Sequence, residues 1–228
     1  MEIDDPVIVA LQAMVTAARE EFDLAVTFHE IWKPAAYDHE LHNRLGKSYA
    51  TQAFLVTRTA LRREMVLALM RLWDTNKKSV RMERIWHQLR DKEVIDALAS
   101  DRASCAGFGD LLEFMREDLQ DKADKARELI ARYMEGGSHN NILETLRTLR
   151  HERLAHRRAS LATAPGATAT DEEIEEFYQD NSKLIQILLS FVNAMAYDPK
   201  DTAGVFALYA KSFWARLQPD EKKRNGAD

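Results

Sequence analysis

Apolar residues recur along most of this chain with the three- and four-residue spacing of amphipathic helices. One such stripe covers Val7–Ala25, and Pro34 is expected to end that first helix near Trp32. A second stripe predicts one long helix from about Asp38 to Trp73, in which Gly46 is a mild weakness and not a break. No stretch alternates between apolar and polar residues as a half-buried strand does, so the pattern predicts an all-α fold.

The same spacing predicts the later helices, and capping residues mark where some of them begin. Thr170 and Glu173 have the spacing of a capping box, and Ser138 or Asn140 is expected to cap the helix that follows Gly136-Gly137. Together the helices predict one domain over residues 1–218, followed by a charged tail over 219–228 that we expect to be disordered. The later helices are expected at about Met82–Leu89, Lys92–Ser100, Asp110–Met134, Asn140 onward, Asp171–Ala196 and Thr202–Leu217.

Composition narrows the protein class without naming a function. The chain has 228 residues and a single cysteine, Cys105, so an internal disulfide is excluded and a reducing cytoplasm is the expected location. No basic-then-apolar leader begins the chain and no apolar run is long enough to span a bilayer, so we expect no membrane partner. The net charge of −5 argues against a protein that coats nucleic acid nonspecifically.

Ligands for a metal or cofactor are not predicted. His39 and His42 lie three residues apart near His29, but no acidic or other third ligand sits at a matching spacing. The sequence also lacks a glycine-rich phosphate loop and zinc-type cysteine spacing. We therefore expect neither a metal nor a cofactor.

The stretch Leu146–Ser160, LRTLRHERLAHRRAS, changes character partway along one helix. Ile142, Leu146 and Leu149 form a core-facing stripe, but the next positions on that stripe are Arg153 and His156. Five arginines and two histidines stand against one glutamate between positions 147 and 158. Burying such groups without partners costs several kcal/mol. Either acids meet them inside the fold, or the helix emerges into solvent, or this face forms a site.

Phosphate chemistry is the use that these residue types suit best. Histidine exchanges protons near neutral pH, and the arginine guanidinium binds phosphate oxygens through paired N–H donors. A histidine and an arginine on neighbouring turns supply an acid or base and a charge stabiliser for phosphoryl transfer.

Two stretches resemble the HEPN superfamily. Arg150, the polar His151, four further residues and His156 match its signature of an arginine followed at four to six residues by a histidine. The segment Leu61–Leu89 is similar to the region of abortive-infection HEPN proteins where a long helix ends in a Leu-x-Asp-like turn before a basic loop and a short helix. The resemblance implies a toxin-like protein whose fold is an antiparallel helical bundle of HEPN type with extra N- and C-terminal helices.

The resemblance also implies an activity. The implied activity is metal-independent cleavage of RNA by a homodimer whose two motif helices build one composite cleft. The implied setting is a defence or toxin–antitoxin system, with a possible antitoxin partner. In that cleft His156 is the general base or acid and Arg150 holds the scissile phosphate. The expected substrate contacts are His151, Arg153 and Arg157. Some members carry a tyrosine two residues past the histidine, where this chain has Arg158, which puts any reading based on that tyrosine in doubt.

Two other functions remain open at this point. In the first, the chain is a noncatalytic HEPN module that binds RNA, nucleotide or a protein partner. In the second, it is a helical interaction protein with no nucleic acid partner. In the second case Arg150 and His156 are structural ion-pair residues. Burial of both side chains against acids of the same chain favours that structural reading.

Overall fold

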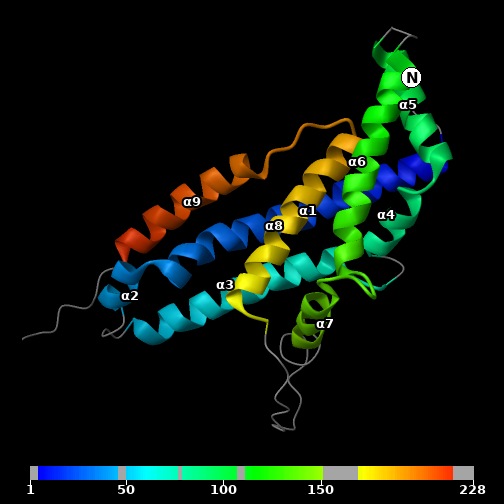
Figure 1. The fold of residues 1–228 in the computed structure, drawn as a ribbon. Helices are drawn as coiled ribbons and strands as arrows, with labels where there is room; N and C mark the ends of the chain where they lie inside the picture. The colour runs from blue at the N-terminus through cyan, green and yellow to red at the C-terminus, as the bar shows by residue number, and fades with distance from the viewer. Residues whose placement is uncertain (1–4, 46–49, 77–78, 107–110, 151–168, 218–228) are drawn as a thin grey trace, which may run out of the picture. The chain divides into compact units, whose positions relative to one another are not determined.

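The computed structural model describes residues 5–45, 50–76, 79–106, 111–150 and 169–217. These residues form helices and connecting turns, with only an isolated bridge between Trp73 and Arg81 as extended pairing (Figure 1). The all-α prediction is therefore confirmed. The helices are α1 Pro6–Tyr37, α2 His39–Leu45, α3 Thr51–Leu72, α4 Met82–Gln88, α5 Lys92–Ala106, α6 Leu112–Tyr133, α7 Asn140–Leu149, α8 Asp171–Val192 and α9 Pro199–Arg216.

The chain divides into two compact units, and α1 and α3 each contribute residues to both. The first unit comprises Met1–Asp23 and Val66–Pro199, and the second comprises Leu24–Met65 and Lys200–Asp228. The single domain over residues 1–218 stays a prediction. The expected tail over residues 219–228 lies outside the described residues.

In the first unit α6 runs alongside both α5 and α8 (Figure 1), and α7 contacts both α6 and α8. The stripe of α8 is buried along its length, and Phe177, Leu188 and Phe191 are fully inaccessible to solvent. From α1, Phe22 meets Tyr178 of α8 with ring centroids 5.5 Å apart. These apolar contacts hold the elements that present the motif helix α7.

The second unit has a smaller core around Trp214 of α9. It is built from Ala35, Leu41, Leu45, Phe54, Ala210 and Trp214. The indole nitrogen of Trp214 donates to the carbonyl of Ile31 at 2.9 Å, and Arg44 donates to the carbonyl of Trp214 at 2.7 Å. Both polar contacts tie α9 to α1 and α2 within this unit.

The first helix continues past Pro34, so the predicted end near Trp32 is wrong. Proline lacks the N–H that would bond the carbonyl of Glu30, which costs about 3 kcal/mol in a helix interior. Burial on both sides offsets that cost, because Trp32 before the proline and Ala35 after it are almost inaccessible. The amide of Asp38 then bonds the carbonyl of Pro34 at 2.9 Å, which carries the helix one turn beyond.

The expected continuous helix from Asp38 to Trp73 is also wrong. The chain instead forms α2, which ends at Leu45, and α3, which begins at Thr51. The Thr51 hydroxyl donates to the carbonyl of Leu45 at 2.6 Å and so satisfies a group that a continuing helix would have bonded. The boundaries of the later helices agree more closely with the predictions. The helix that begins at Lys92 continues to Ala106, past the interruption expected at Cys105.

Candidate functional site

A tight turn sets the start of α7, the helix that carries the motif. Gly136 has φ of 80°, a conformation that favours glycine. A Cβ on Gly137 would lie 2.2 Å from the carbonyl oxygen of Ala131, so no larger residue fits there without movement. His139 is the N-cap and its side chain makes no capping bond, so the expected cap at Ser138 or Asn140 is wrong. The side-chain amide of Asn140 instead donates to the backbone carbonyl of Tyr133 at 3.2 Å.

The buried face of α7 ends before its C-terminus. Ile142, Leu143 and Leu146 are buried, whereas Leu149 is only half-buried. The core stripe therefore includes Leu143 and weakens one turn earlier than the sequence pattern predicts. Arg150 is the C-cap residue, with helical φ and ψ of −58° and −50°. Its backbone lies at the point where the apolar face has ended.

Arg150 is held by an aspartate from a distant part of the chain. Its Nη2 lies 3.2 Å from Oδ2 of Asp74, in the loop after α3. The two side chains are 25% and 19% exposed, so the pair is partly buried and open on one side. Among the described residues this is the one hydrogen bond that the Arg150 guanidinium makes. A guanidinium carries five N–H donors, so this bond engages only part of its capacity.

The carboxylate of Asp74 is itself fixed by its own turn. Oδ1 accepts the backbone N–H of Thr75 at 2.7 Å and that of Asn76 at 3.2 Å. Burial of the Asp74 carboxyl acts to raise its pKa, but the N–H of Asn76, the bond and charge of Arg150 and the N–H of Thr75 outweigh it. The pKa of Asp74 is consequently lowered from its ordinary value. Asp74 stays ionised at neutral pH and holds the Arg150 fork in place.

The neighbouring Trp73 anchors this loop in the core. Its indole nitrogen donates to Oδ1 of the buried Asn181 at 2.9 Å. Its ring lies against Tyr133 and Phe177, with centroids 5.4 Å and 5.9 Å away. From α7, Arg147 pairs with Glu144 on its own helix and reaches the carbonyl of Trp73 at 3.4 Å. The residue next to Asp74 is therefore held by contacts with α6, α7 and α8.

A second polar cluster includes Arg132, Tyr133 and His139. Glu176 of α8 accepts from Arg132 at 3.1 Å and from His139 at 2.9 Å. Asp180 accepts from Arg132 at 2.7 Å and from the Tyr133 hydroxyl at 2.7 Å. Burial and the bond to Asp180 raise the pKa of Tyr133 well above its usual value, so the hydroxyl remains a donor.

Two acids near the start of α8 bond residues outside the stretch Leu146–Ser160. Glu176 serves Arg132 and His139, and Glu173 completes the predicted capping box with Thr170. In the described part of the motif, the carboxylates that meet Arg147 and Arg150 come from Glu144 and Asp74.

Of the five predicted site residues, Arg150 alone is placed. His151, Arg153, His156 and Arg157 lie outside the described residues. Asp74 joins the site although it was not predicted as a site residue. The sequence feature that could have identified Asp74 is the Leu-Trp-Asp turn at the end of α3, which served above only as support for the family resemblance.

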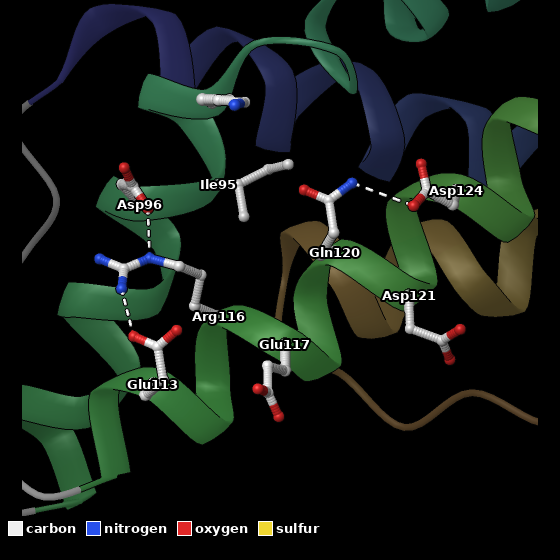
Figure 2. Close-up of a pocket in the computed structure, with 9 residues that line it drawn as sticks. Ile95, Asp96, Glu113, Arg116, Glu117, Gln120, Asp121 and Asp124 are labelled. Atoms are coloured by element: carbon white, nitrogen blue, oxygen red, sulfur yellow. Dashed lines mark hydrogen bonds and ion pairs between the residues drawn. The ribbon is translucent and has the colours of Figure 1, made fainter.

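A hollow of about 560 Å³ lies between α5 and α6, and its side chains differ in kind from those of the motif (Figure 2). Arg116 bridges Asp96 and Glu113, each at 2.6 Å, and Gln120 bonds Asp124 at 3.1 Å. The hydrogen bond and charge of Asp96 raise the pKa of Arg116. Histidine and cysteine are absent from the residues that line this hollow.

Two of the three histidines considered as metal ligands, His29 and His42, make hydrogen bonds within the protein. His42 Nε2 lies 2.7 Å from the carbonyl oxygen of Ala35, and His29 Nδ1 lies 2.8 Å from Glu30. Within the described ranges, histidine, cysteine and acidic side chains form no group of three suited to a metal ion. In the same ranges, no helix combines the length and apolarity needed to cross a membrane.

Comparison with known proteins places the chain in a family. Neither the curated proteins nor the solved structures contain a significant match. The family model for AbiU2, a HEPN family, matches residues 8–213. That match includes both units, the Leu61–Leu89 segment and the whole Arg150 to His156 motif. The chain therefore belongs to the AbiU2 family of abortive-infection HEPN proteins.

Proposed function

We propose that this protein is a metal-independent endoribonuclease, acting as a homodimer with a composite cleft in a defence or toxin–antitoxin system. The observation that carries the proposal is the hold of Asp74 on Arg150. One guanidinium nitrogen is engaged at 3.2 Å, which orients the fork at the end of α7 and leaves other donors for a phosphate. Membership of a HEPN family and the spacing to His156 supply the partner group for proton transfer.

The proposed reaction needs only groups that the chain supplies. The ribose 2′-oxygen attacks the adjacent phosphorus while the bond from phosphorus to the 5′-oxygen breaks. In this proposal one His156 takes the proton of the 2′-hydroxyl, and the His156 of the second chain in the homodimer gives a proton to the departing 5′-oxygen. Arg150 N–H donors stabilise the charge on the non-bridging oxygens of the transition state. His151, Arg153 and Arg157 bind the flanking phosphates.

Cleavage of RNA by the purified chain in excess EDTA tests the activity. We expect the wild type to cut RNA and not DNA of the same sequence, because DNA lacks the attacking 2′-hydroxyl. His156→Ala and Arg150→Ala should lower the rate by at least about a hundredfold, the scale of losing a general base or a charge stabiliser. His87→Ala and Arg84→Ala, at exposed positions on α4, are the matched controls and should cut normally. Equal cleavage by wild type and His156→Ala would implicate a contaminant.

The homodimer is tested by dilution. If the cleft requires two chains, the cleavage rate per chain falls as the protein is diluted below the dissociation constant of the dimer. A rate per chain that stays constant while sedimentation shows dissociation would place a complete active site within one chain.

A noncatalytic HEPN module is the second candidate, and the same ion pair favours it in part. Arg150 already has an acidic partner within its own chain, as expected of a structural residue. In that case the wild type binds RNA, nucleotide or a protein without cutting, and Arg150→Ala alters binding or stability alone. Filter binding beside the cleavage assay separates the two functions.

A further inference from the structure

Helix α9 carries apolar side chains on two sides. One side packs into the core of its own unit, where Ala210 is fully buried and Trp214 is 3% exposed. On the other side Val205, Leu208, Tyr209 and Phe213 are 48%, 62%, 57% and 50% exposed. We call these four residues the α9 stripe. Their spacing of three and four residues places them within about 140° of the helix surface. A contiguous stripe of this kind marks an interaction surface.

The stripe lies beside a hollow at the C-terminal end of α9. Tyr209, Ser212, Phe213, Arg216 and Leu217 line a space of about 470 Å³. The small end of the stripe, Val205, and its bulky end, Phe213, lie at equal distances on either side of Tyr209. A second α9 laid antiparallel therefore brings the Val205 end of each copy to the Phe213 end and hollow of the other.

Charges at the two ends of α9 agree with this arrangement. Asp201 and Arg216 lie about two turns before and after Tyr209, on the same side of the helix as the stripe. Neither forms an ion pair within the described residues. In an antiparallel pair each Asp201 faces the partner copy's Arg216, whereas a parallel pair would place like charges together.

We propose that α9 is a self-association surface, through which two copies of the chain pair antiparallel about a twofold axis near Tyr209. A twofold interface must be complementary to itself, and the distribution of size and charge along the stripe meets that condition. A contact of one helix pair is small among stable interfaces, so the pair should dissociate on dilution. This inference does not depend on the nuclease proposal, because it is tested by mass and cross-linking alone.

Disulfide cross-linking tests the geometry directly. In a Cys105→Ser background, which removes the exposed native thiol, Tyr209→Cys places a thiol near the twofold axis. Lys211→Cys places one on the far side of the same helix and is the matched control. Mild oxidation should link most of the Tyr209→Cys chains into dimers and few of the Lys211→Cys chains. Equal linkage in both variants, or none in either, overturns the proposal.

Sedimentation at several protein concentrations tests the association itself. Leu208→Glu should lower the mass seen at high concentration, while Val56→Glu, at a 67% exposed apolar residue of α3, should leave it unchanged. Circular dichroism confirms that each variant is folded. A mass equal to wild type in folded Leu208→Glu overturns the proposal, as does a wild type that is monomeric at every concentration, which would assign the stripe to a different partner.

Charge exchange gives a second readout that keeps the apolar stripe intact. Asp201→Arg places like charges opposite each other twice in the dimer and should weaken association about fivefold. The double variant Asp201→Arg with Arg216→Asp restores opposite charges and should recover most of that loss. Weakening without recovery would contradict the antiparallel arrangement.

Discussion

Replacing Arg150 by alanine and Asp74 by asparagine, singly and together, measures how strongly the site holds its arginine. The pair joins the end of α7 to the loop after α3 at 3.2 Å, with side chains 25% and 19% exposed. Exposed ion pairs contribute about 0.2–1 kcal/mol and hydrogen bonds to charged groups about 1.5–3 kcal/mol. For this partly buried pair we expect each single substitution to lower the free energy of unfolding by about 1 kcal/mol.

The coupling between the two residues is the decisive quantity. Asp74→Asn keeps an oxygen that accepts the N–H groups of Thr75 and Asn76, so it removes mainly the charge. The double variant should therefore lose about 1 kcal/mol less than the sum of the single losses. Urea denaturation at pH 7 gives the three values, and Arg84→Ala, an exposed arginine outside the site, should change stability by less than about 0.5 kcal/mol.

The coupling should also depend on pH in a defined direction. The pKa of Asp74 is lower in the folded protein than its ordinary value. Its stabilisation is therefore complete above the unfolded pKa of about 3.9 and is lost as the pH falls through the lower folded pKa. Additive single losses at pH 7 would refute the ion pair. A coupling that weakened between pH 7 and pH 5 would point to a titrating group other than Asp74.

Four further substitutions give stability predictions, three in elements that position the site and one, Gly204→Ala, in α9 for comparison. Gly137→Ala should cost several kcal/mol, because the new Cβ meets backbone 2.2 Å away, whereas Gly204→Ala, in open space within α9, should stabilise by up to about 1 kcal/mol. Asn181→Ala should cost about 2–3 kcal/mol, since it leaves the buried indole N–H of Trp73 without its acceptor. Thr170→Ala removes the cap of α8 and should cost about 1 kcal/mol. Denaturation curves compared with wild type measure all four changes.

The helical content was predictable because it depends on local spacing. Apolar residues spaced three and four positions apart form helices wherever a core exists to bury them. The capping box of Thr170 and Glu173 marked the start of α8 in the sequence. Boundaries that depend on tertiary packing were not predictable. Pro34 stays inside α1 because its neighbours are buried, and nothing local at Gly46 distinguishes a weak helix from the break between α2 and α3.

The candidate site shows the same division. A cationic face after the apolar part of the motif helix was visible in the sequence, and Arg150 lies where that face begins. Its partner was not visible, because Asp74 is 76 residues away and meets it only through the packing of Trp73 against Tyr133 and Phe177. From the sequence, the cationic face could meet acids inside the fold, emerge into solvent or form a site. The structure pairs Arg150 with an acid of its own chain, which makes it a positioned residue.

The most direct test of the account is the fate of RNA that carries a single 2′-deoxy substitution at a mapped cleavage position, in EDTA. We predict that the unmodified RNA is cut there with a 2′,3′-cyclic phosphate on the upstream product. We further predict that the 2′-deoxy substitution blocks this cut and that His156→Ala cuts neither substrate. Cleavage of the substituted RNA at the same position, or unchanged cleavage by His156→Ala, would contradict a 2′-hydroxyl mechanism centred on this motif.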